Sequence, residues 1–195
     1  MNFLKSTIFL FLLLLVSCSK SLSAPPEPIM CNVPLMQEIP SKPLEGIVYG
    51  RRVRDVTRAY LTLSSFEIIQ PLYSDRGVML PTKAQITIDT IIYPLASDNA
   101  QTNAKLYEGK TFSYGLGKDI LPERIGFDNL ALNFTKQDGR GENSYLVNRD
   151  HKFLVQFGKL NKGKMPVKLY LCASSLATQI SGDFEVEFGD EPYWE

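Results

Sequence analysis

The amino-acid sequence predicts an all-β fold, either an antiparallel β-sandwich or a jelly roll, for residues 44–195. The first observation is that apolar and polar residues alternate with a period of two in seven segments of this region. Side chains alternate across a strand, so each segment has one face to bury and one face for water. The second observation is that no window of about twelve residues shows the 3.6-residue period of a helix. Helix is therefore expected in the leader and, at most, in one short connection.

The predicted strands are short and turn-forming residues separate them. In chain order they lie within residues 60–69, 86–89, 112–116, 129–135, 151–157, 167–171 and 184–188. Glycine within two residues of Asp, Asn or Ser marks turns at residues 75–77, 138–141, 161–163 and 181–182. The turn region 137–143 carries two carboxylates, as calcium loops do, but its Asp138-Gly139 pair favours a hairpin turn. Many short strands with turns between them are typical of sandwiches and jelly rolls.

The chain begins with a segment typical of a secretory signal peptide. Lys5 precedes an unbroken run of nine apolar residues from Ile8 to Val16, and the run ends at Ser17. A helix needs about 20 apolar residues to span the hydrocarbon core of a bilayer, so this run is too short. One alternative is ordinary cleavage after Ala24, which would give a secreted protein, but Pro25 would then follow the cleaved bond. Another is a buried N-terminal helix, which the lack of a polar face does not support.

The tetrad Leu15-Val16-Ser17-Cys18 closes this run and resembles the lipobox of bacterial lipoproteins. The resemblance implies that residues 1–17 are removed and that Cys18 is lipidated on its sulfur as the new N-terminus. It implies a protein of the cell envelope attached to the membrane through this lipid. Ser19, in place of aspartate, implies the outer membrane rather than the inner membrane. The resemblance covers the leader only, so it does not identify the family of the folded domain.

Residues 18–43 are expected to join the lipid to the domain as a spacer. Six of the twelve prolines lie between residues 19 and 43. Proline-rich chain adopts extended geometry and lacks a periodic hydrophobic face, so it acts as a semi-rigid tether. The predicted organisation is therefore a signal peptide at 1–17, lipidated Cys18 and a Pro-rich tether at 18–43, and the β-domain at 44–195.

If Cys18 carries the lipid, two of the three cysteines remain and can pair with each other. Cys31 and Cys172 are then left in an oxidising compartment, where a pair of cysteines favours a disulfide. The alternative is two unpaired buried thiols, since cysteine also behaves as a small apolar residue.

Charge composition argues against two classes of partner. The chain has 21 basic and 21 acidic residues, and this balance argues against nucleic acid and against a polybasic membrane patch as the main partner. No cofactor is indicated by any motif. The expected partners are the membrane, through the lipid, and an envelope protein or carbohydrate.

Two groups of residues are candidates for ligand contact. Arg52, Arg54 and Arg58 share one phase if their segment is extended, and can meet an anionic sugar, a lipopolysaccharide phosphate or an acidic protein surface. A solvated strand edge is the alternative explanation of this cluster. Tyr193 and Trp194, near the C-terminus, suit stacking on a sugar or docking in a partner's pocket.

Catalytic motifs are not evident. His151 is the one histidine, and it lies on the apolar phase of its segment. The sequence has no Gly-x-Ser-x-Gly nucleophile elbow for which it could act as the general base, so it is expected to be structural. One histidine and a disulfide also leave too few ligands for zinc. The sequence thus favours a lipid-anchored binding or structural module of the envelope, without enzymatic activity. The alternative is a hydrolase of envelope carbohydrate, whose paired carboxylates would converge in one concave pocket.

Overall fold

The computed structural model describes residues 26–32, 34, 38–56, 58–61, 65–74, 76–89, 91–92, 100–115, 125–126, 129–136, 141–148 and 150–188. Within these ranges the all-β prediction is confirmed, because thirteen strands are accompanied by one α-helix of eight residues and one short 3₁₀ turn. In the described part of the domain this helix, α2 (Ala100–Tyr107), agrees with the expectation of at most one short connecting helix. None of the helices in the described ranges is long and apolar enough to cross a membrane.

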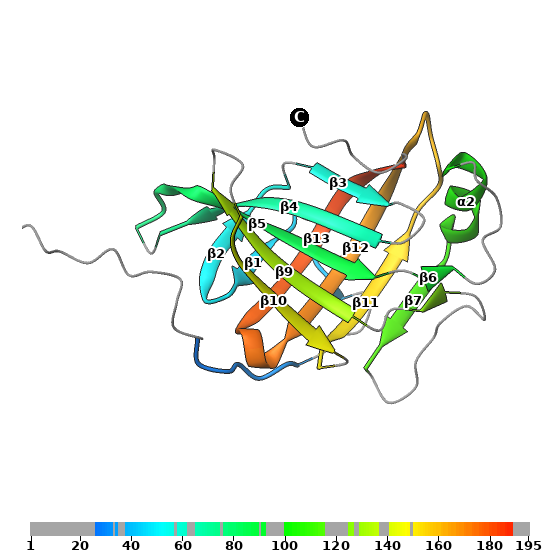
Figure 1. Ribbon diagram of the computed structural model, residues 1–195. Coiled ribbons are helices and arrows are strands. Elements are labelled where there is room, and N and C mark those ends of the chain that lie inside the picture. The colour runs from blue at the N-terminus through cyan, green and yellow to red at the C-terminus, as the bar shows by residue number, and fades with distance from the viewer. Residues whose placement is uncertain are drawn as a thin grey trace, which may run out of the picture.

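Figure 1 shows the arrangement of these elements along the chain. They are β1 (Glu45–Val48), β2 (Arg51–Arg54), β3 (Arg58–Leu61), β4 (Ser65–Tyr73), β5 (Met79–Asp89), β6 (Ile91–Ile92), α2 (Ala100–Tyr107), β7 (Thr111–Tyr114), β8 (Ile125–Gly126), β9 (Asn129–Lys136), β10 (Gly141–Asn148), β11 (Lys152–Phe157), β12 (Lys164–Ala173), η2 (Ser174–Leu176) and β13 (Thr178–Phe188).

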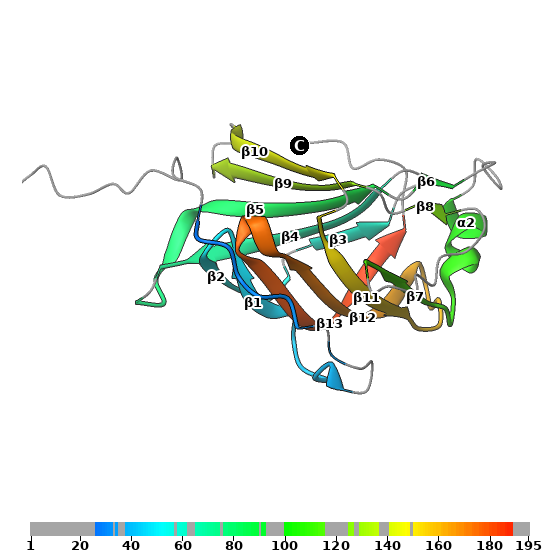
Figure 2. The ribbon, with the colours of Figure 1, turned by 90° about the horizontal axis from the view of Figure 1, so that it is seen from below.

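Eleven strands form one hydrogen-bonded sheet in the order β10-β9-β5-β4-β2-β1-β13-β12-β11-β7, with β3 paired to both β4 and β13. The pairing is antiparallel throughout this sheet except between β13 and β3. Figure 2 shows that the sheet bends over on itself, so that β10, β9, β5 and β4 form a layer above β1, β13 and β12. Strands β6 and β8 pair separately.

The hydrophobic core fills the space enclosed by this sheet. Alternate residues of β12 point into it, and Met165, Val167 and Leu169 are almost fully buried. The helix α2 covers one end, where the ring of Tyr107 lies 5.2 Å from the ring of Phe157, centroid to centroid. Period-two alternation therefore describes the inner face of the sheet correctly.

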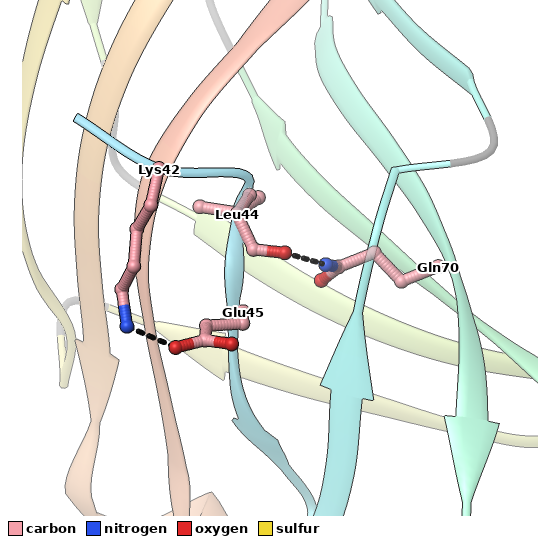
Figure 3. Close-up of polar contacts among 4 residues, drawn as sticks. All are labelled: Lys42, Leu44, Glu45 and Gln70. Carbon is pink, nitrogen blue, oxygen red and sulfur yellow. Dashed lines mark hydrogen bonds and ion pairs between the residues drawn. The ribbon is translucent and has the colours of Figure 1, made fainter. Parts of the chain in front are cut away.

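A break in the pairing along β4 is closed by a side chain. Strand β4 pairs with β3 as far as Ile69 and with β2 from Leu72, so Gln70 lies between the two partners. The Gln70 side chain is fully buried, and its Nε2 donates a hydrogen bond to the carbonyl of Leu44, at 3.4 Å. Figure 3 shows this bond between β4 and the chain just before β1. One buried amide thus connects the two layers where backbone pairing stops.

The turn between β1 and β2 packs against the far edge of the sheet. Tyr49, with φ 51°, stacks on Tyr145 of β10 with ring centroids 4.4 Å apart. Burial, together with the neighbouring Tyr145, raises the pKa of the Tyr49 hydroxyl to about 12. This aromatic pair holds the bend of the sheet.

The strand predictions differ from the structure in two ways. The alternating run 60–69 belongs to two strands, because β3 and β4 pair antiparallel with Leu61 opposite Phe66. A hairpin preserves alternation on both sides of its turn, so the pattern does not reveal the reversal. Five strands, β1, β2, β6, β8 and β10, were not among the predicted segments. The hairpin that the 137–143 region favours is confirmed by the antiparallel pairing of β9 with β10.

The described part of the proline-rich segment packs on the domain. We call residues 26–32 and 38–43 the N-terminal strap. Its Ile39 is buried with Leu154 and Tyr170, on the face of β11 and β12 opposite the core. The backbone N–H of Ile29 donates to the carbonyl of Ser174 at 3.1 Å, and that of Asp183 donates to the carbonyl of Lys42 at 2.8 Å. Packed structure therefore begins before Leu44, the residue at which the sequence predicts the start of the domain. An extended segment buries single residues at irregular intervals, so its packing leaves no periodic pattern in the sequence.

The predicted disulfide between Cys31 and Cys172 is present, with a Cα–Cα distance of 5.8 Å. It joins the strap to β12, and Cys172 takes the face opposite Leu169 and Leu171, as its phase predicts. The disulfide therefore fixes the strap on the sheet without occupying space in the main core.

Candidate binding surface

Four adjacent strands place one residue each in a row on the outer face of the sheet. Ile47 of β1 lies opposite Arg52 of β2. Arg52 in turn lies opposite Tyr73 of β4, and Tyr73 lies opposite Met79 of β5. Residues directly opposite each other in a sheet project to the same face. The row therefore combines a cation, an aromatic ring and two aliphatic side chains.

A second arginine joins this row. Arg54 lies two positions after Arg52 on β2, and both are exposed. The guanidinium carbon of Arg54 lies 4.4 Å from the centroid of the Tyr73 ring, which is the geometry of a cation–π contact. Guanidinium groups bind carboxylate and phosphate oxygens with paired N–H donors. The pair of arginines thus offers anion-binding donors beside an aromatic surface.

The hairpin that joins β4 to β5 carries two exposed apolar side chains: Met79, which belongs to the row, and Val78, which precedes it in the turn. The backbone N–H of Ser74 donates to the carbonyl of Val78 at 2.9 Å, and the Val78 N–H donates to the Ser74 hydroxyl at 3.1 Å. Val78 is 63% exposed and Met79 is 56% exposed, while Ile47 of the row is 41% exposed. Turn hydrogen bonds therefore hold large apolar groups in solvent.

We call Ile47, Arg52, Arg54, Tyr73, Val78 and Met79 the basic-apolar face. A groove of about 340 Å³ lies on part of this face. Ile47, Arg52, Arg54 and Tyr73 line it together with Glu45, Gly46, Val53 and Gly77, and Met79 and Val78 lie next to it in the sequence and register. Glu45 is the one acidic residue of this lining, and its carboxylate forms an exposed ion pair with Lys42 (Figure 3). Glu45 lies opposite Arg54 in the pairing of β1 with β2, so one carboxylate faces the two arginines and is shared with Lys42.

Arg58 lies elsewhere on the molecule. The chain is not extended from Arg54 to Arg58, because Asp55 takes the left-handed region with φ 63° and Arg58 begins β3. Arg58 lines a second groove, of about 610 Å³, together with other residues of β3 and residues of β13. The structure thus brings Arg52 and Arg54 together and separates Arg58 from them.

This second groove, which we call the acidic groove, contains four carboxylates. Besides Arg58 and Lys164, its charged lining residues are Asp55, Asp183, Glu185 and Glu187. Lys164 Nζ lies 3.0 Å from Glu187 Oε1, and this hydrogen-bonded carboxylate raises the pKa of the Lys164 ammonium. No group of three or more His, Cys, Asp or Glu in the described ranges is arranged to hold a metal ion.

A third groove, of about 410 Å³, lies beside the disulfide and contains His151. The His151 ring is buried and stacks on Tyr114 with centroids 4.9 Å apart. This aromatic packing agrees with the structural role expected of His151 from its position on the apolar side of the strand pattern.

Three of the predicted site residues, Cys18, Tyr193 and Trp194, lie outside the described residues. Lipidation and C-terminal stacking therefore stay predictions. Sequence reasoning missed Tyr73, Val78 and Met79. No local signal links them to Arg52 and Arg54, since their proximity depends on the register of β2, β4 and β5.

Comparison of the chain with protein-family models, curated proteins and solved structures finds no match.

Proposed function

We propose that the protein is a lipid-anchored, extracytoplasmic component of the bacterial cell envelope, and that its basic-apolar face binds an anionic partner there. The observation that carries the binding role is the Arg52, Arg54 and Tyr73 cluster, with two guanidinium groups beside one aromatic ring. Exposed apolar patches rimmed by charge mark interaction sites. The lipobox-like tetrad that ends at Cys18 supports the anchor, and Ser19 favours the outer membrane.

The anchor is tested by replacing Cys18 with alanine. We expect Cys18→Ala to leave uncleaved precursor or to release soluble protein, because the sulfur that carries the acyl groups is gone. The three acyl chains usual in Gram-negative lipoproteins hold firmly, whereas one chain binds only marginally. Membrane fractionation and the mass of the mature protein give the readout.

Two further variants control this experiment. Ser21→Ala should leave processing and membrane attachment unchanged, and Ser19→Asp should move the protein from the outer to the inner membrane fraction. A processed Cys18→Ala protein that still sediments with membrane would contradict lipid anchoring at this residue.

A hydrolase of envelope carbohydrate is the second candidate function, and the acidic groove is the observation that favours it. Asp183 and Glu185 project from one face of β13, and Asp55 approaches from the connection after β2. Pairs of carboxylates serve glycoside hydrolysis as acid and base or nucleophile.

Purified protein incubated with peptidoglycan and with lipopolysaccharide tests this candidate. If it is correct, Asp183→Asn combined with Glu185→Gln should lower product release by at least about a hundredfold, the scale of lost acid–base catalysis. Lys162→Ala, outside the groove, is the control. Absence of new reducing ends with the unaltered protein over a broad pH range would reject the hydrolase.

A further inference from the structure

We propose that the basic-apolar face docks on the anionic headgroups of the same bilayer that holds the Cys18 lipid. In this arrangement Val78 and Met79 sit at the level of the headgroups, and Arg52 and Arg54 bind lipid phosphates. The proposal rests on the proposed lipid anchor and names the partner of the proposed binding face.

The distribution of exposed apolar side chains points to this face. Five large apolar residues in the described part of the chain are exposed: Met30, Ile47, Val78, Met79 and Leu146. Ile47, Val78 and Met79 belong to the basic-apolar face. Apolar groups on a turn, next to cations, are the combination that binds the interface between headgroups and acyl chains.

The charges around the face fit an anionic surface. Arg52 and Arg54 lie on it, and exposed Arg76 lies in the adjoining hairpin turn. Among the described residues that line the groove of this face, Glu45 is the one acid; it lies opposite Arg54 and pairs with Lys42. Asp75, next to Arg76, lies outside the described residues. The other carboxylates described above line the separate acidic groove, with residues of β3 and β13. Anionic lipids attract such basic segments and add to apolar binding.

The position of the strap brings this face to the membrane. A Cβ added to Gly50, in the turn between β1 and β2, would lie 3.4 Å from the Cβ of Pro26, so the strap starts beside that turn. Strand β2 pairs antiparallel with β4, which places the turn at the same end of the sheet as the β4–β5 hairpin. Figures 1 and 2 both show the start of the strap and these two hairpins at the end of the molecule opposite α2.

Chain length limits how far the face can lie from the lipid. Seven residues separate Cys18 from Pro26. At about 3.5 Å per residue, the eight steps between the two Cα atoms span at most about 28 Å. The face therefore stays within a short distance of the bilayer once Cys18 is anchored.

An anionic bilayer accounts for more of the face than a soluble anionic ligand does. A sugar phosphate or an acidic peptide would satisfy Arg52 and Arg54 but would leave Val78 and Met79 exposed to water. A bilayer surface supplies phosphates for the guanidinium groups and an apolar layer beneath them.

The proposal is tested on the lipidated protein reconstituted in vesicles. One set of vesicles is phosphatidylethanolamine with one quarter phosphatidylglycerol, and the other replaces the phosphatidylglycerol by phosphatidylcholine. Amide hydrogen exchange is followed in segments 45–54 and 76–80. We expect both segments to be protected in the anionic vesicles only, with protection falling as salt rises, because screening weakens attraction to the surface.

Paired substitutions show whether the face is responsible. Arg52→Ala with Arg54→Ala should weaken docking about thirtyfold, at about fivefold for each arginine near an anionic surface. Val78→Ser should weaken docking at high as well as at low salt, because it removes apolar contact. Lys110→Ala with Lys159→Ala removes the same charge beside α2, at the opposite end, and should have no effect.

Each other outcome overturns the proposal in a distinct way. Protein that inserts through its lipid but shows equal exchange in both kinds of vesicle leaves the anchor intact and rejects docking. Protection by a soluble anionic oligosaccharide, without protection by anionic vesicles, makes the face a glycan site. Protein that carries no acyl group and does not associate with vesicles contradicts the anchor itself.

Discussion

Gly46→Ala is expected to destabilise the protein by about 3 kcal/mol or more. Gly46 has φ +150°, in a region that residues with a side chain rarely adopt, and this alone costs about 1–3 kcal/mol. A Cβ at this position would also lie 2.1 Å from the carbonyl oxygen of Gln179 in the paired strand β13. Backbone cannot move aside without separating β1 from β13, so the overlap adds to the cost. Urea unfolding at fixed pH measures the loss.

Gly163→Ala is the matched control for this substitution. Gly163 also has positive φ, at +78°, but an added Cβ there meets nothing within 4 Å. The substitution should therefore lower the free energy of unfolding only by the strain of the left-handed backbone, about 1–2 kcal/mol. Equal losses for Gly46→Ala and Gly163→Ala would show that the close pairing of β1 with β13 is not as described.

Removing the disulfide, by Cys31→Ala with Cys172→Ala, is expected to cost up to about 5 kcal/mol. The cysteines are 141 positions apart, so the bond closes most of the domain into one loop and restricts the unfolded chain strongly. Unfolding of the unreduced double variant and of the unaltered protein gives the difference. In the unaltered mature protein, unfolded without reductant, neither cysteine should react with a thiol reagent.

Met30→Ala controls for changes in the strap itself. Met30 neighbours Cys31 and is 81% exposed, so its truncation should change stability by less than about 0.5 kcal/mol. Reaction of both cysteines with the thiol reagent before reduction would contradict the bond.

Local patterns were sufficient to predict the inward faces of β12 and β13. In β12 and β13 the inward phase of Val167, Leu169 and Val186 follows directly from alternation, and these residues lie in the core. The pairing of Cys31 with Cys172 followed from counting cysteines, because the predicted lipidation of Cys18 leaves two to pair.

The same patterns failed where distant parts of the chain decide the outcome. Leu154 and Tyr170 occupy the outward phase of β11 and β12, yet both are buried because the strap covers them. An apolar residue on the outward phase indicates a cover but does not show which segment provides it. Gln70 looks like an ordinary polar strand residue, and its burial follows only from the break between β2 and β3.

The candidate site shows most clearly which features local sequence patterns predict and which depend on tertiary structure. The sequence by itself determined the all-β class, the anchor hypothesis at Cys18 and the interest of Arg52 and Arg54, because period, spacing and motif are local properties. Only the tertiary structure placed Arg54 over Tyr73, moved Arg58 to another groove and brought Met79 beside the arginines. Strand register and the turn at Asp55 decide these positions, and both depend on pairing between segments that the linear pattern does not relate.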